Sequence, residues 1–62
     1  MKRRLLIKKL EANGWYFDRH GSNHDIYTDG RRKESIGRQR EIDEILAKNI
    51  LKRNDINNTA WR

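Results

Sequence analysis

The sequence of 62 residues contains no cysteine and no long run of apolar residues. The lack of cysteine excludes disulfide bonds, thiolate zinc sites and a thiol nucleophile, and it is typical of a reducing compartment. The short apolar run near the start of the chain is interrupted by Lys8 and Lys9, so the sequence predicts neither a signal peptide nor a membrane span. We therefore expect a cytoplasmic protein.

Aromatic residues are also scarce, and four of the five lie between residues 14 and 27, together with both histidines. A chain of this length forms one small domain with little stability to spare. We expect a core of leucine and isoleucine with a few aromatic side chains, Trp15 and Phe17 among them. Tyr16 and Tyr27 are better candidates for stacking on nucleic-acid bases, although tyrosine in a strand is also ordinary packing.

Acidic residues are outnumbered, with 9 Asp and Glu against 15 Lys and Arg, which gives a net charge of +6. The excess lies in two clusters, residues 1–10 and 31–40, and this distribution favours a polyanion as partner. A basic surface that serves only solubility is the alternative. The clusters consist of Lys2, Arg3, Arg4, Lys8 and Lys9, and of Arg31, Arg32, Lys33, Arg38 and Arg40.

The spacing of apolar residues predicts an α+β domain with the order α-β-β-β-α. The three strands would form an antiparallel meander, with both helices on one face of the sheet. The domain would occupy residues 1–54. Residues 55–62 would form a polar tail that can be disordered. The helices are predicted over 2–13 and 41–54, the strands over 15–20, 24–28 and 31–36, and the turns over 21–23 and 29–30.

Two details of this prediction concern side-chain direction. The stripe of Ile42, Ile45, Leu46, Ile50 and Leu51 has helical spacing and is predicted to be core. In the second strand, His24 and Ile26 fall on the same face, so regular alternation would turn His24 toward the core. A bulge near Asn23, or a place at the end of the sheet, would instead leave His24 exposed.

Several short motifs in this order resemble the HicA family of toxins, over about residues 3–54. The resemblance implies an mRNA interferase of a type II toxin–antitoxin system, with a fold like the double-stranded-RNA-binding domain and His24 as the catalytic residue. It also implies a HicB-like antitoxin partner. Where the family usually has Pro-Arg-His, this sequence has Gly37-Arg38-Gln39. The motifs are Gly14-Trp15, Gly21-Ser22-Asn23-His24, Tyr27, Asp29-Gly30-Arg31-Arg32, Arg40-Glu41-Ile42, Leu46-Ala47-Lys48 and Ile50-Leu51-Lys52.

The chemistry of RNA cleavage fits the residues of this stretch. The 2′-hydroxyl of RNA attacks the adjacent phosphorus once a base takes its proton, and imidazole suits that task because its unperturbed pKa is about 6.5. His24 is therefore the candidate base, with no metal and no cofactor. The general acid stays unassigned, and His20 is the only other imidazole. The candidate donors to phosphate are Arg19, Gly21, Ser22, Arg31, Arg32 and Arg38.

Three alternatives stay open at this point. A metal site made of Asp18, His20, His24 and Asp25 has no helical ligand spacing to support it. A non-catalytic RNA-binding module, or an attenuated toxin, would need only the basic residues. A protein-interaction domain would use its charge for an acidic partner and would not bind RNA. If the chain is a ribonuclease, the antitoxin should cover His24 and at least one of Arg31, Arg32 and Arg38.

Overall fold

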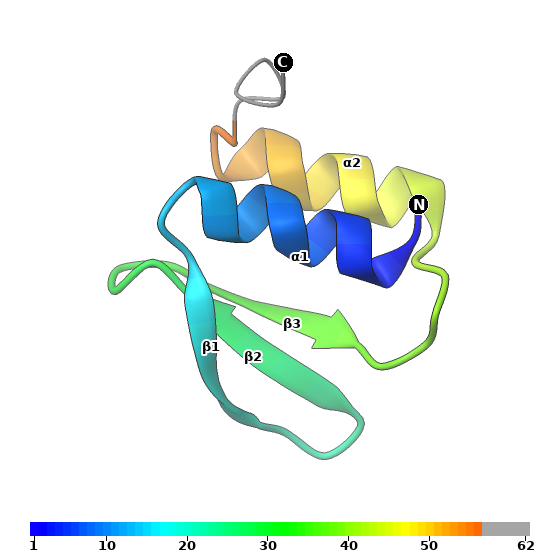
Figure 1. Ribbon diagram of the computed structural model, residues 1–62, viewed down its shortest axis with the longest axis horizontal. Helices are drawn as coiled ribbons and strands as arrows, with labels where there is room; N and C mark the ends of the chain where they lie inside the picture. Colours follow the sequence, from blue (N-terminus) through cyan, green and yellow to red (C-terminus); the bar gives the residue numbers. More distant parts are fainter. Residues whose placement is uncertain (57–62) are drawn as a thin grey trace.

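The computed structural model describes residues 1–56 and has the predicted order of one helix, three strands and one helix (Figure 1). The α+β fold class is therefore confirmed. Residues 57–62, which make up most of the predicted tail, lie outside the described residues, whereas Ile56 is buried in the core. The elements are α1 (Arg3–Ala12), β1 (Tyr16–His20), β2 (His24–Thr28), β3 (Lys33–Gly37) and α2 (Glu44–Arg53).

The end of α1 and the turn between β2 and β3 lie where the sequence predicts them. Gly14 has a φ of +86°, a left-handed conformation that glycine adopts without strain just after a helix. In the loop between β2 and β3, Gly30 has a φ of +97°, and the Asp29 carboxylate accepts the backbone N–H groups of Arg31 and Arg32 at 2.8 and 2.7 Å. Both turns therefore depend on residue types that the sequence places there.

The sheet is antiparallel with the order β1-β2-β3, and both helices lie on the same face of it (Figure 1). Along β1 and β2, Phe17 pairs with Tyr27 and Arg19 pairs with Ile26, so Asp18 is an extra residue that forms a bulge. Cross-strand partners share a face of the sheet. Phe17 and Tyr27 therefore face the helices, and Arg19 and Ile26 face away from them, on what we call the open face.

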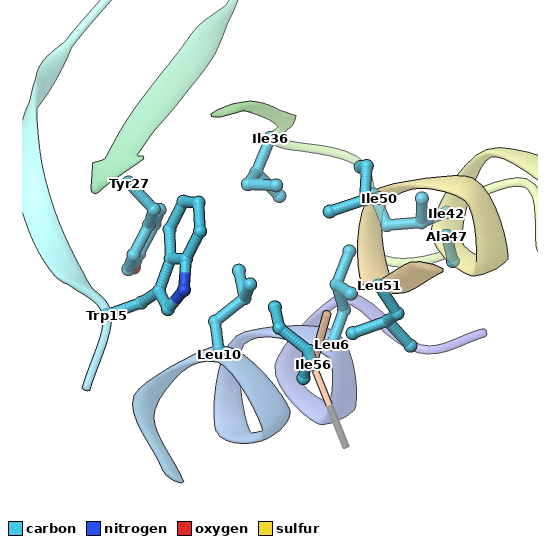
Figure 2. Packing of buried hydrophobic residues seen from close by; sticks show 10 residues of the cluster. All are labelled: Leu6, Leu10, Trp15, Tyr27, Ile36, Ile42, Ala47, Ile50, Leu51 and Ile56. Carbon is cyan, nitrogen blue, oxygen red and sulfur yellow. The ribbon is translucent and has the colours of Figure 1, made fainter. Parts of the chain in front are cut away.

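The core lies between the helix-covered face of the sheet and the two helices (Figure 2). Leu6 and Leu10 come from α1, and Tyr27 and Ile36 come from the sheet. Trp15 belongs to the core as predicted. Tyr27 is also buried, so it is not available for stacking on bases, whereas Tyr16 is exposed on the open face. The remaining core residues are Ile42, Ala47, Ile50, Leu51 and Ile56.

The prediction that the whole stripe of α2 is core is wrong for Ile45 and Leu46, whose exposed fractions are 71% and 46%. The reason is the helix start. Asp43 is the N-cap and accepts the backbone N–H of Leu46 at 3.1 Å, so Ile42 lies before the helix and does not set its phase. Within α2, the buried residues are Ala47, Ile50 and Leu51.

Phe17 was also predicted to be core, and this is wrong because its exposed fraction is 43%. It lies on the helix-covered face, but β1 is an edge strand. There its ring contacts Tyr27 edge-on, with the two ring centroids 5.8 Å apart. The Phe17 ring also lies 4.9 Å from the ring of His20, so these two neighbours cover only part of it.

An ion pair ties β3 to the end of α2. Arg53 donates to both oxygens of Glu34 at 2.8 and 2.7 Å, and Asn54 donates to the same carboxylate at 2.7 Å. These hydrogen bonds hold the pKa of Glu34 below its ordinary value of 4.5, and the hydrogen bond from Arg53 has the largest effect. A lowered pKa means that the ion pair stabilises the fold above the ordinary carboxyl pKa and that this contribution is lost as the pH falls through the folded value.

We therefore expect Glu34→Gln to lower the free energy of unfolding at pH 7 by about 1 kcal/mol, a figure that allows for the exposure of Arg53. The substitution should also make the stability less sensitive to acid. Thermal melts of both proteins between neutral and acidic pH measure this. Glu11→Gln is the matched control, because Glu11 is exposed and has no ion pair within residues 1–56. Equal losses in the two variants would contradict the assigned role of Glu34.

Candidate active site

His24 is the first residue of β2, and its side chain is exposed on the open face of the sheet. The conflict seen in the sequence rested on the assumption that Ile26 faces the core. In the structure Tyr27 faces the core, and Ile26 lies on the open face with His24. The bulge near Asn23 is therefore not needed, and the bulge that exists lies in β1.

Glycines flank His24 on both sides of the strand. Gly21 donates its backbone N–H to the His24 carbonyl oxygen at 2.6 Å, and Gly37 is the cross-strand partner of His24 in β3. A Cβ atom on residue 21 would lie 3.1 Å from the His24 carbonyl oxygen, so this close approach favours glycine. Neither of these two neighbours has a side chain of its own, and the His24 side chain is exposed, so a large substrate can reach the imidazole.

Gln39 occupies part of the space that Gly37 leaves. A Cβ atom on residue 37 would meet the Gln39 amide, whose Cδ and Nε2 atoms lie 3.3 and 3.7 Å from that position. Since residue 37 shares a face with its partner His24, the amide lies on the open face, on which the His24 side chain also lies. The sequence singled out Gln39 only as a departure from the family motif. The fold brings it to the candidate site.

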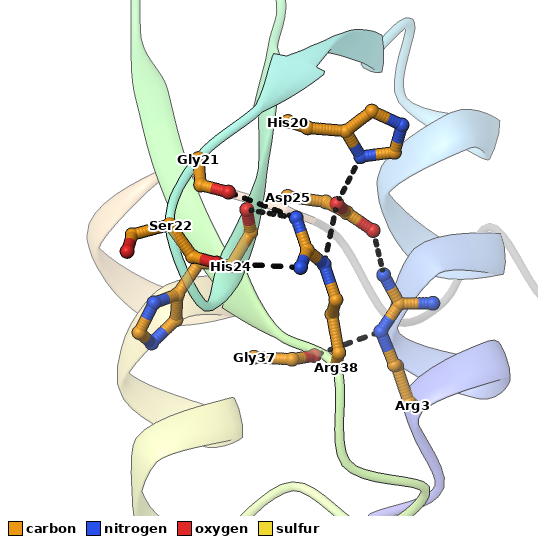
Figure 3. Close-up of polar contacts among 8 residues, drawn as sticks. All are labelled: Arg3, His20, Gly21, Ser22, His24, Asp25, Gly37 and Arg38. Carbon is orange, nitrogen blue, oxygen red and sulfur yellow. Dashed lines mark hydrogen bonds and ion pairs between the residues drawn. The ribbon is translucent and has the colours of Figure 1, made fainter.

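Arg38 fixes the turn that carries His24 (Figure 3). Its Nη2 atom donates to the carbonyl oxygens of Gly21 at 2.9 Å and His24 at 3.2 Å, and its Nη1 atom donates to that of Ser22 at 3.4 Å. These bonds tie three carbonyl groups of the turn to one guanidinium. In this structure Arg38 therefore positions the hairpin.

Asp25 joins three basic side chains on the helix-covered face (Figure 3). Its carboxylate accepts from Arg3 Nη2 at 2.7 Å and Arg38 Nε at 3.0 Å, and it contacts His20 Nδ1 at 2.8 Å. The hydrogen bond with His20, followed by that from Arg38, lowers the pKa of Asp25. Arg3 also donates to the Gly37 carbonyl oxygen at 2.8 Å. This carboxylate therefore braces the backbone on both sides of His24.

The two imidazoles point to opposite faces of the hairpin. His20 pairs with Asp25, not with His24, because the extra residue Asp18 shifts the register of β1 by one. Figure 3 shows the His20 ring beside Asp25 and the His24 ring directed away from it. His20 is therefore not placed to act as the acid partner of His24.

The faces also separate the four side chains considered as metal ligands. His20 and Asp25 lie on the helix-covered face, and His24 lies on the open face. Asp18 contacts Lys33 Nζ at 3.6 Å on the open face. In the part of the chain that the structure describes, no three His, Asp or Glu side chains come together as a set of metal ligands.

The residues predicted to contact phosphate lie in two places. Arg19 is on the open face beside the strand of His24, and the exposed Ser22 is in the adjacent turn. Arg31 and Arg32 lie in the loop between β2 and β3, at the opposite end of the sheet (Figure 1). The fold therefore brings Arg19 to the same face as His24 and Ser22 to the same end of the sheet. It does not bring Arg31 and Arg32 near His24.

Comparison with known families decides what kind of chain this is. Residues 3–56 match the family described as HicA toxin of bacterial toxin–antitoxin. The chain belongs to the HicA toxin family. Searches of curated proteins and of solved structures returned no match. Membership of the HicA family makes this chain a toxin of a toxin–antitoxin pair, and it implies an antitoxin partner.

The HicA match covers nearly the whole described structure, from the first turn of α1 to Ile56. It therefore includes the hairpin of His24, the loop of Gln39 and the helix that closes the core. Neither helix of residues 1–56 has the length and apolar character that crossing a bilayer requires.

Proposed function

We propose that this HicA-family toxin is an endoribonuclease that cleaves mRNA without a metal, with His24 as the general base. The observation that carries the proposal is the exposed imidazole on the open face, flanked by Gly21 and Gly37. A base must reach a 2′-hydroxyl within a bulky chain, and this position gives it access. The network around Asp25 and Arg38 holds the hairpin in one geometry, which lowers the cost of positioning.

In the proposed reaction, His24 takes the proton of the 2′-hydroxyl, and the 2′-oxygen forms a bond to the adjacent phosphorus. The bond from phosphorus to the 5′-oxygen breaks, and that oxygen takes a proton from water. The products are a 2′,3′-cyclic phosphate and a 5′-hydroxyl. The Gln39 amide, the Ser22 hydroxyl and the Arg19 guanidinium are the proposed donors to the phosphate oxygens, where negative charge develops.

A test of this function is an RNA cleavage assay in the presence of EDTA, followed by analysis of the new ends. We expect cleavage to persist, because the nucleophile belongs to the RNA and the base to the protein. A 2′-deoxy substitution at the cut position should abolish cleavage there, and the same substitution at a neighbouring position serves as control. Cleavage at the 2′-deoxy position would mean that an external nucleophile is used and would refute the mechanism.

A second candidate function is RNA binding without cleavage, or with weakened cleavage. The observation that favours it is Gln39, which stands where the resemblance implies a histidine. Its amide donates and accepts hydrogen bonds but does not exchange a proton as imidazole does. The second candidate predicts RNA affinity with no new RNA ends in the assay above, so the same experiment separates the two functions.

We also propose that a HicB-like antitoxin neutralises the toxin by covering His24 together with Arg38. These two residues belong to one end of the sheet, whereas Arg31 and Arg32 lie at the other. An acidic antitoxin surface would associate quickly with this basic chain. A complex in which His24 stays accessible would mean that inhibition works by another route.

A further inference from the structure

The start of α1 and the loop after β3 enclose an open, strongly basic cavity of about 690 Å³. Two backbone contacts hold its walls together: Arg3 N–H donates to the Arg40 carbonyl oxygen at 2.8 Å, and Lys2 pairs with Glu41 as an isolated bridge. The residues that line the cavity are Lys2, Arg3, Arg4, Arg38, Arg40 and Glu41. Five of these six side chains are basic, so the cavity attracts anions.

Three of the basic side chains have no acidic partner among the described residues. In residues 1–56, no carboxylate pairs with Lys2, Arg4 or Arg40, whereas Arg3 and Arg38 share the carboxylate of Asp25. Like charges that gather without a counter-ion raise the free energy of the folded state. A bound anion would remove that cost.

The position of these bases on α1 supports the same conclusion. Lys2 is the N-cap and makes no capping hydrogen bond with its side chain, and the first turn contains no acidic residue. Positive side chains at the N-terminus of a helix oppose the helix dipole, so helix stability does not explain their presence. An anion in the cavity would interact favourably with both the bases and the dipole.

We propose that this cavity is a phosphate subsite for single-stranded RNA, which holds a backbone phosphate other than the one that is cleaved. Guanidinium groups are planar and bind phosphate oxygens through paired hydrogen bonds, and the cavity presents several of them. The proposal rests on the proposed ribonuclease function.

The cavity and the candidate active site belong to the same end of the sheet. Arg38 lines the cavity and donates to the His24 carbonyl oxygen, and Arg3 lines it and donates to the carbonyl oxygen of Gly37, the strand partner of His24. The His24 imidazole, however, points away from both guanidiniums (Figure 3). The subsite therefore holds RNA that passes the end of the sheet, and the reacting phosphate lies on the other face.

This separation gives the subsite a kinetic signature. A group that contacts a phosphate in the same way before and during the reaction contributes to binding and not to the chemical step. Loss of the subsite should therefore raise KM and leave kcat nearly unchanged, whereas loss of His24 should lower kcat.

The test compares two double variants that each remove two positive charges. Arg4→Ala with Arg40→Ala empties the cavity of two unpaired guanidiniums, and Lys48→Ala with Lys52→Ala removes two exposed lysines from α2. All four side chains are exposed, and thermal melts show whether each variant is folded. The probe is a single-stranded RNA with 2′-O-methyl groups throughout, which cannot be cleaved, and its affinity is measured over a range of salt concentrations.

We expect the cavity variant to bind this probe about tenfold more weakly or worse, the size of one charge-assisted hydrogen bond. The slope of log affinity against log salt should become shallower by about 0.7, the contribution of the one phosphate contact that is lost. The α2 control should change both quantities much less. On cleavable RNA, the cavity variant should have a raised KM and a kcat within about twofold of the wild type.

Several results would overturn the proposal. Equal losses in the two double variants would show that only net charge matters, and a fall in kcat equal to that in kcat/KM would place the cavity at the reacting phosphate. Normal RNA binding with loss of antitoxin binding would assign the cavity to the protein partner. If wild-type protein does not cleave RNA at all, the probe still reports on the subsite, so failure of the ribonuclease function and failure of the subsite remain distinguishable.

Discussion

His24→Ala is expected to slow RNA cleavage by roughly 10²–10⁴-fold, the usual size of a lost acid–base catalyst. The fold should survive, because the imidazole is exposed and forms no hydrogen bond within residues 1–56. RNA affinity should change little, because the proposed phosphate contacts come from basic side chains elsewhere. Single-turnover cleavage rates, together with probe affinity and thermal melts, separate a catalytic loss from a binding or folding loss.

His20→Ala is the matched control for this experiment. It removes the same group from the same hairpin, but on the helix-covered face beside Asp25. We expect it to keep most of the cleavage rate and to lower stability slightly. A folded His24→Ala protein that cleaves at the normal rate would show that the hairpin is a binding surface only.

The second large effect concerns stability. Ile50→Ala should lower the free energy of unfolding by about 2–5 kcal/mol, because it removes a large side chain from a closed core and leaves a cavity. The exposed fraction of Ile50 is only 2%. A domain of this size has about that much stability in total, so a large part of the variant should be unfolded at 25 °C.

Ile45→Ala is the internal control, since the same substitution is made in the same helix at a residue with an exposed fraction of 71%. We expect it to change the free energy of unfolding by about 0.5 kcal/mol or less. Urea denaturation of the two variants measures both values. If Ile45→Ala were as damaging as Ile50→Ala, the phase of α2 described above would be wrong.

The elements of the fold could be predicted from the sequence because their signals are local. The turn residues of the β2–β3 loop, the glycine after α1 and the apolar spacing of both helices act within a few residues. The helix boundary at Asp43 is local as well. It was missed because the apolar Ile42 extends the helical pattern past the cap.

The arrangement of the candidate site could be predicted only in part. His24 follows from a short motif and from the chemistry of imidazole. The contacts among Arg3, Asp25 and Arg38 join parts of the chain that are 13 to 22 residues apart, so no local sequence pattern predicts them. The place of Gln39 depends on the strand register, because only the pairing of Gly37 with His24 brings its amide to the open face.

The bulge at Asp18 also decides how many histidines the face of the candidate active site can hold. If Asp18 were paired regularly after Phe17, each later residue of β1 would move by one, and His20 would stand opposite His24 in place of Asp25. The hairpin would then present two imidazoles side by side, the arrangement that an enzyme needs for a general acid and a general base together. An evolving toxin could therefore pass between a one-histidine and a two-histidine site by losing or gaining this bulge, with no change in any proposed catalytic residue.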